Sequence, residues 1–286
     1  MVYLKYYKQY LFLSLIICCA LYSTAQPGVR QSGEIGISIG PAHYFGDLNT
    51  RSKINTFNGS AGLFFRKNFN NYIAGRASIN YARLGYSDKY NTKNLYQRTR
   101  NLNFTTNVFE MSLQGDFNFY KFAPNERYYD FTPYVTLGIG AFTYDPYTYL
   151  DGEKFFLRTM NTEGQGLPGR KKPYGSMAFC MPIGVGLKWN INHRFNLGFE
   201  VSHRFTTTDY LDDVSTTYVG AASFINIQNP TAYNPAILLQ DRSYELGTPI
   251  GVPNRQRGYS KQKDQYIMAH IMLSFNLMSY RCPYVD

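Results

Sequence analysis

The residue types best suited to catalysis gather late in the sequence, where Ser202, Ser274, His270 and Glu200 combine hydroxyl, imidazole and carboxylate groups. A serine that passes its proton to a histidine, itself oriented by an acid, is the arrangement of many hydrolases. A hydrogen-bonded polar interior uses the same residue types, and spacing alone does not distinguish the two interpretations. A lipid hydrolase is therefore one alternative for this chain.

Recognised catalytic motifs do not support that alternative. The sequence has no G-x-S-x-G, no H-E-x-x-H, no P-loop and no paired C-x-x-C. Its glycine-rich runs at 36–40 and 138–140 are not followed by a helical pattern, so they predict close packing rather than phosphate binding. We expect a protein that is not an enzyme and that has no catalytic residue, no cofactor and no metal ligand.

A second group of charged residues occurs at the polar positions of segments that are otherwise alternately apolar. Any one of them would be costly to bury without a partner. Because three are basic and three acidic, we expect them to form an ion-pair network inside a closed interior. These residues are Arg76, Lys188, Arg204, Glu110, Asp116 and Glu200.

The elements that would position these residues are strands with one apolar face. Large apolar residues fall at every second position from Met177 to Trp189, and again from Phe195 to Val201. Strict alternation predicts a strand that is apolar on one side. The segments are longer than the ~5–6 residues usual in soluble sheets and suit membrane strands of about 9–11 residues. The eight predicted strands lie at about 33–45, 57–65, 72–84, 108–120, 132–144, 177–190, 195–205 and 265–278.

The connections between these segments alternate in length, which favours a membrane barrel over a soluble one. Short turns at one end and long loops at the other are typical of outer-membrane barrels. We therefore predict an all-β fold, an eight-stranded antiparallel transmembrane up-and-down barrel of the OmpA/OmpX type, with a lumen filled by side chains. Trp189, Tyr72, Phe119 and Tyr120 lie near the short turns, where an interfacial aromatic belt belongs. The short turns are expected near 67–71, 121–130 and 190–193, and the long loops at about 43–56, 85–106, 145–175 and 208–263.

The first residues predict export from the cytoplasm. A basic start with Lys5 and Lys8 precedes an apolar stretch at 11–21, and small residues follow it up to Ala25. This is the pattern of a secretory signal peptide that is cleaved after Ala25. The expected domains are a signal peptide (1–25), a barrel in the outer membrane of the cell (26–280) and a periplasmic tail (281–286).

Two cysteines remain after the predicted cleavage. Cys180 is expected to point inward near the long-loop end of its strand, whereas Cys282 follows the last strand on the opposite side. Their separation of roughly 20 Å, at ~3.3 Å per residue, exceeds the reach of a disulfide. Cys282 is therefore a free thiol or an intermolecular one, and we hypothesise an intermolecular bond.

Basic residues are concentrated in the predicted long loops of a chain whose formal charge is +10. Such loops could contact the phosphates of lipopolysaccharide, or they could simply be solvated. Outer-membrane lipid is an expected partner, and nucleic acid is not. The loop at 208–263 is long enough to be either functional or disordered. The basic residues are Lys89, Lys93, Arg98, Arg100, Arg170, Lys171, Lys172, Arg255, Arg257, Lys261 and Lys263.

Two segments resemble a known family. The stretch GEIGISIGPAHYFGDLN at 33–49 and the closing Cys282-Pro283 resemble the PorG-like outer-membrane barrels of the type IX secretion and gliding machinery of Bacteroidota. The matching positions in the first stretch are Tyr44, Gly46, Asp47, Leu48 and Asn49.

This resemblance implies a structural role at the periplasmic face. The family associates with a periplasmic ring, made of a lipoprotein and its partner, and holds it against the outer membrane. The docking surface would then comprise the short turns and Arg281, Cys282, Pro283 and Tyr284, and a covalent link through Cys282 would fit. The alternatives are an OmpX-like barrel for surface binding or adhesion, and the lipid hydrolase.

Overall fold

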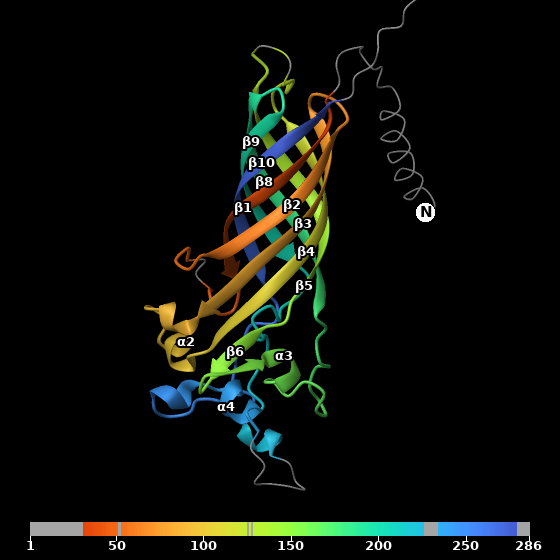
Figure 1. The fold of residues 1–286 in the computed structure, drawn as a ribbon. Helices are drawn as coiled ribbons and strands as arrows, with labels where there is room; N and C mark the ends of the chain where they lie inside the picture. Colours follow the sequence, from red (N-terminus) through yellow and green to blue (C-terminus); the bar gives the residue numbers. More distant parts are fainter. Residues whose placement is uncertain (1–30, 51–52, 125, 127, 226–233, 279–286) are drawn as a thin grey trace, which may run out of the picture. The chain divides into compact units, whose positions relative to one another are not determined.

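The computed structural model describes residues 31–50, 53–124, 126, 128–225 and 234–278 (Figure 1). The predicted signal peptide and the predicted docking residues Arg281, Cys282, Pro283 and Tyr284 lie outside these residues.

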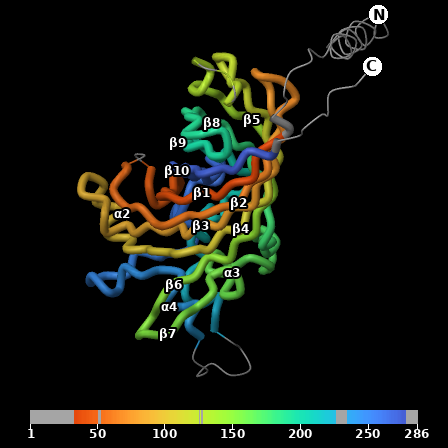
Figure 2. The backbone as a smooth tube through the Cα atoms, turned by 45° about the horizontal axis from the view of Figure 1, so that its top comes forward, coloured from red at the N-terminus to blue at the C-terminus, as the bar shows by residue number. Residues whose placement is uncertain are grey.

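Eight long antiparallel strands form a closed barrel, which confirms the predicted fold class (Figures 1 and 2). The strands follow one another around the barrel in the order β3-β2-β1-β10-β9-β8-β5-β4, and pairing between β3 and β4 closes it. β1 and β10, the first and last strands of the barrel, pair with each other, and we call this pair the seam. The strands are β1 (Gln31–Phe45), β2 (Asn58–Asn68), β3 (Ile73–Ser87), β4 (Asn103–Asn118), β5 (Phe131–Thr143), β8 (Met177–Asn192), β9 (Phe195–Thr206) and β10 (Gln265–Met278).

The exterior of the barrel is apolar and its interior is polar. On β4, for example, Met111 and Leu113 are each 64 % exposed, while the intervening Ser112 is buried. An apolar exterior is stable in hydrocarbon, where a closed barrel also satisfies every backbone N–H and C=O group. The protein is therefore built to span a membrane.

Two basic residues on neighbouring strands mark the limits of this apolar band, one towards the short turns and the other towards the long loops. Lys67 of β2 and Arg83 of β3 are both exposed on the outer face, and Lys67 pairs with Gly75 of β3. The strand from Gly75 to Arg83 measures ~26 Å at ~3.3 Å per residue, or roughly 20 Å in height for a tilt of ~40°. That height is close to the ~25 Å apolar band of outer-membrane barrels.

The short turns lie at one end of the barrel, which we call the turn end. Tyr72, Phe119, Tyr120 and Trp189 are exposed there, in the positions expected for an interfacial belt. The turn between β4 and β5 folds inward, so that Phe122 is buried and its ring lies 4.1 Å from the Nζ atom of Lys188. Phe122 thereby closes the lumen at the turn end.

The long loops fold into a compact layer at the opposite end, the loop end, which is drawn at the bottom of Figure 1. We call this layer the cap. Among the described residues, no helix is long and apolar enough to span a bilayer. The elements of the cap are η1 (Asp88–Tyr90), α2 (Leu95–Arg100), β6 (Tyr147–Leu150), β7 (Glu153–Phe156), α3 (Leu157–Met160), η2 (Ala221–Phe224), α4 (Ala236–Gln240) and η3 (Ser243–Leu246).

Two of the long loops differ from the prediction, one in its length and the other in how well it is packed. The loop predicted at 85–106 is shorter, because β3 and β4 continue to pair as far as Ser87 and Asn103. The described part of the segment predicted at 208–263 is packed, with Leu211 and Leu239 buried.

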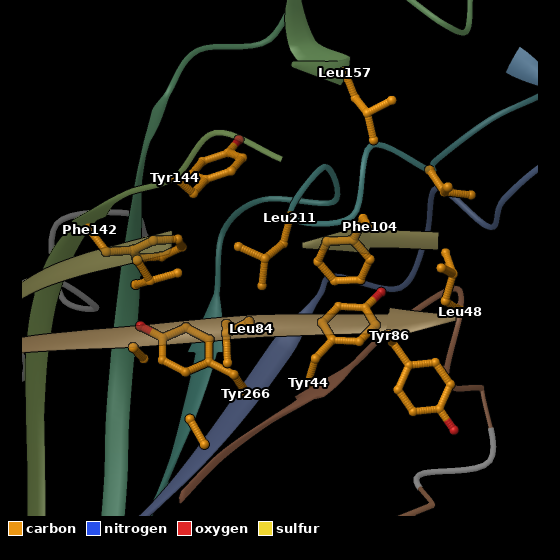
Figure 3. Close-up of a cluster of buried hydrophobic side chains, with 14 of the residues drawn as sticks. Tyr44, Leu48, Leu84, Tyr86, Phe104, Phe142, Tyr144, Leu157, Leu211 and Tyr266 are labelled. Carbon is orange, nitrogen blue, oxygen red and sulfur yellow. The ribbon is translucent and has the colours of Figure 1, made fainter. Parts of the chain in front are cut away.

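An apolar core joins the cap to the barrel. Tyr44, Leu84 and Phe104 from the strands meet Leu211 from the β9–β10 loop and Leu157 from α3 (Figure 3). The core fills the loop end of the lumen, so the lumen is closed at both ends.

A charge placed in the middle of the apolar band should destabilise the barrel. Leu113 lies between Ala77 of β3 and Ile139 of β5, and Leu113→Lys should lower the free energy of unfolding by ~2–4 kcal/mol because the ammonium would face hydrocarbon. Thr143→Lys, near the loop end of the same face, should cost no more than about 1 kcal/mol. Denaturant titration in lipid vesicles measures both, and equal losses would contradict the placement of the band.

Candidate functional site

The lumen contains a network of buried ion pairs. Arg76 contacts Glu200 at 2.6 Å and Asp116 at 3.4 Å, and Arg204 contacts Glu110 at 3.2 Å. All six charged residues predicted to share the lumen are buried there.

Two further members of this network were not predicted. Arg66 bridges Glu34, at 3.0 Å, and Asp116, at 2.7 Å, and Lys188 contacts Glu34 at 3.1 Å. The alternation of the strands would have placed both in the lumen, because neighbouring side chains point to opposite faces. Arg66 follows the outward Phe65, and Glu34 precedes the outward Ile35. With these two, four acidic and four basic side chains balance one another, as burial requires.

Tyrosine hydroxyl groups bind to the ion pairs, and close packing leaves little empty volume in the lumen. The hydroxyl of Tyr134 donates to Glu200 at 2.8 Å, and that of Tyr266 donates to Glu110 at 2.7 Å. A cavity lined in part by Arg66, Tyr134 and Met272 has a volume of only about 10 Å³, which is room for at most about one water molecule. The lumen at this level is a solid polar core and provides no pore.

The structure does not assemble the Ser/His/acid combination on which the hydrolase alternative depends. The Nε2 atom of His270 lies 2.9 Å from Ser60 rather than contacting Ser202 or Ser274. Ser202 accepts a hydrogen bond from Arg204, and Ser274 donates one to Glu34. Glu200 lies opposite His270 in the β9–β10 register but is held by Arg76 and Tyr134. These groups act as parts of the lumen core.

The segment Tyr44–Asn49, which contains the five matching positions of the first resemblance stretch, lies at the loop end, and we call it the latch. The hydroxyl of Tyr44 lies 2.5 Å from Asp212 and 3.1 Å from Asp264, two residues of the β9–β10 loop that are buried with it. Gly46 is required beside them, because a Cβ atom there would lie 2.0 Å from the Asp264 carboxylate. The latch therefore holds both ends of the long loop against β1.

The remaining latch residues extend this attachment. The carboxylate of Asp47 accepts from the backbone N–H of Tyr259 at 2.9 Å, and Leu48 is fully buried in the apolar core. The Asn49 side chain accepts from the backbone N–H of Lys53 and donates to the carbonyl of Tyr44, both at 3.0 Å. All five resemblance positions thus have structural roles in fastening the cap.

Two of the predicted basic surface residues are instead buried in the cap. Arg100 pairs with Asp88 at 2.7 Å, and Arg257 contacts Glu163 at 3.2 Å and Asp213 at 3.7 Å. The prediction that these two arginines contribute to an exposed basic surface is wrong. Each guanidinium neutralises carboxylates that would otherwise be buried without a counter-charge.

Buried carboxylates outnumber buried guanidiniums in the cap. Burial is the main cause that raises the pKa of Asp47 to about 6, that of Asp209 to about 7 and that of Asp213 to about 6. The pKa values of Asp212 and Asp264 are raised further by burial and by neighbouring carboxylates. Within the described residues, no group of three or more His, Cys, Asp or Glu side chains is arranged to hold a metal ion. The raised pKa values mean that these aspartates hold protons at a higher pH than ordinary aspartates do.

The closed barrel with its apolar exterior and sealed polar lumen defines the protein as a small membrane-spanning β-barrel of the outer-membrane type. A protein-family model, described as a domain of unknown function (DUF6089), matches residues 9–233. The match spans more than half of the chain, and the chain belongs to this family.

Solved structures with a similar chain course include three outer-membrane or surface proteins. Ail of Yersinia pestis, solved with the heparin analogue sucrose octasulfate, is 12 % identical, with 86 % of this chain and 99 % of that chain covered and a TM-score of 0.39. Neisserial surface protein A is 9 % identical, with 88 % and 100 % covered and a TM-score of 0.41. OprG of Pseudomonas aeruginosa is 11 % identical, with 87 % and 97 % covered and a TM-score of 0.36. No curated protein matches the chain.

Removing one lumen carboxylate should destabilise the barrel strongly. Glu34→Ala leaves Arg66 and Lys188 without their shared counter-charge, and the free energy of unfolding should fall by ~3–5 kcal/mol. Glu126→Ala breaks the exposed pair with Lys121 at the turn end and should cost less than about 1 kcal/mol. Denaturant titration followed by gel mobility of the folded barrel compares the two, and a loss below 1 kcal/mol for Glu34→Ala would contradict the network's importance.

The cap should loosen as the pH rises. Its aspartates have higher pKa values when folded than the ~3.9 of an unfolded Asp, so the folded cap binds more protons than the unfolded one. The stability they contribute is present below about pH 4 and is lost progressively as the pH passes about 6 to 7. Limited proteolysis between β9 and β10 should be faster at pH 8 than at pH 5.

Two controls make this comparison specific. Cleavage rates are divided by those of the heat-unfolded protein at each pH, which removes the pH dependence of the protease. Asp209→Asn removes the aspartate with the highest stated pKa and should reduce the difference between the two pH values. Equal or slower normalised cleavage at pH 8 would contradict the protonated cap.

Proposed function

We propose that this barrel is a docking protein that anchors a periplasmic lipoprotein complex, of the kind found in the type IX secretion machinery, to the outer membrane. Since the lumen is filled at the level of its ion pairs and provides no pore there, we look for the function on the outer surfaces, first at the two ends. The turn end would face the periplasm, because short turns face that side in outer-membrane barrels.

An aromatic depression at the turn end is the observation that carries this proposal. It has a volume of about 440 Å³ and is lined by Tyr72, Phe119, Tyr120, Lys121, Tyr128, Tyr129 and Phe131. Depressions of ~300–1,000 Å³ with apolar walls and a few polar groups are typical binding sites. Tyrosines are also enriched at the centres of protein interfaces.

The conformation of Tyr128 adds to this support. Its backbone has a φ of 76° and its side chain is 82 % exposed. Non-glycine residues with positive φ are uncommon, and such strained conformations cluster at functional sites. The turn thus presents an aromatic side chain to solvent at a conformational cost.

The latch does not contribute to this proposal. Its five resemblance residues lie at the loop end, on the opposite side of the apolar band from the aromatic depression. The other part of the resemblance, Cys282-Pro283, lies outside the described residues. Docking therefore depends on the turn-end surface and on the proposed tail contact.

A second candidate is surface binding by the cap, as in an adhesion barrel. The folding of the cap on its own core and latch favours it, because loops without a function rarely maintain such order. Exposed tyrosines of the cap, such as Tyr149 and Tyr259, and its exposed cations would then contact a polysaccharide or lipopolysaccharide outside the cell.

Paired variants at the two ends distinguish the candidates. Tyr120→Ser with Tyr128→Ser should reduce recovery of the periplasmic lipoprotein complex at least tenfold when the barrel is captured from mild-detergent membranes. Tyr149→Ser with Tyr259→Ser changes two similarly exposed tyrosines in the cap and should leave recovery unchanged. Mass spectrometry identifies the captured proteins. Unchanged recovery with the turn-end pair would remove the docking proposal, and loss of glycan binding with the cap pair would support the second candidate.

A further inference from the structure

Arg83 is a charged side chain on the outer, lipid-facing surface of β3. In the part of the chain that the structure describes, it forms no hydrogen bond and no ion pair. A guanidinium in this position is costly unless it meets an anion or water at the membrane interface. Its partner has to come from outside the protein.

The surroundings of Arg83 locate it at that interface. The outward residue before it on the same face, Tyr81, packs against Phe109 of β4 with ring centroids 5.1 Å apart. Aromatic pairs of this kind lie where hydrocarbon gives way to headgroups. Towards the cap, the exposed face becomes polar, beginning with Arg83 and its β4 partner Asn107.

The geometry leaves room and a second donor for an anion. Tyr81 donates to the Oδ1 atom of Asn107 at 3.0 Å, which leaves the amide N–H groups of Asn107 to donate to another acceptor. On the β2 side, the pairing with β3 ends at Ser60 opposite Ala82, and a Cβ atom at the preceding Gly59 would meet no atom within 4 Å. Arg83 of β3 and Asn107 of β4 therefore place donors from two paired strands side by side, with no side chain at Gly59 to obstruct an anion.

The charge of the neighbouring loop selects an anionic ligand. Between residues 83 and 107, the exposed charged residues are Arg83, Lys89, Lys93 and Arg98. The one acidic residue of this stretch, Asp88, is buried and paired with Arg100. The exposed charged residues of this segment are therefore all basic, and the first of them, Arg83, adjoins the apolar band.

We propose that Arg83, with Asn107, binds the phosphate group of a membrane lipid in the leaflet at the loop end. A guanidinium presents paired N–H donors that match two phosphate oxygens, which a lysine does not. The acyl chains of the same lipid would lie along the outward residues of β3 and β4 on the turn-end side of Arg83. Lys89, Lys93 and Arg98 increase the local concentration of anionic headgroups. This site is independent of docking at the turn end.

Native mass spectrometry of the detergent-purified barrel tests the site, with bisphosphorylated lipid A as the probe. The wild type should retain the lipid, and Arg83→Gln should lower the bound fraction at least fivefold. Arg83→Lys should give an intermediate value, because the charge is kept and the paired donors are lost. Lys172→Gln removes an exposed cation from another loop and should have no effect. Gel mobility without heating verifies that each variant is folded.

Two further arms separate the phosphate from the rest of the lipid. Dephosphorylated lipid A should bind the wild type no better than the phosphorylated form binds Arg83→Gln. Equal retention of both lipids by the wild type, or unchanged retention by Arg83→Gln, would overturn the proposal. Displacement of lipid A by millimolar inorganic phosphate would show that the site takes the free anion, which also overturns the lipid assignment.

Discussion

Every backbone N–H and C=O group that lies in hydrocarbon has to be bonded within the protein, and this constraint determines most of the structure. Strands satisfy it only when the sheet closes, and here the pairing of β1 with β10, the first and last strands, completes the circle. Eight strands enclose little more than their own side chains. The inward residues therefore form a core, and any charge among them needs a partner of opposite sign within that core.

The barrel and the cap meet the cost of buried charge in different ways. In the lumen, four carboxylates face four basic groups, so the charges balance within the network itself. In the cap, the carboxylates around Tyr44 and Asp209 exceed the two buried arginines, so part of the compensation comes from bound protons. The cap is consequently a part of the molecule whose stability depends on bound protons.

Periodicity made the strands and the inward parity of residues such as Arg76 and Glu200 predictable, because an alternating pattern assigns every residue to a face. The same rule would have found Arg66, which lies between outward neighbours on β2. It could not find the burial of Arg100 and Arg257, because loops have no repeating pattern. The role of the latch was equally hidden, since Asp212 and Asp264 lie 168 and 220 residues from Tyr44 in sequence.

Those long separations bear on how the barrel closes. The β1–β10 seam joins the first and last strands, so it is the most non-local pairing in the sheet and loop-closure entropy opposes it most. Polar bonds between these two parts of the chain occur near both ends of the seam: Glu34 accepts from Ser274 at the turn end, and Tyr44 donates to Asp264 at the loop end. Glu34 finds this partner only once β10 is in register, because a shift of one residue would turn Ser274 outward. The ion pairs and the latch therefore stabilise the closed barrel in its correct register.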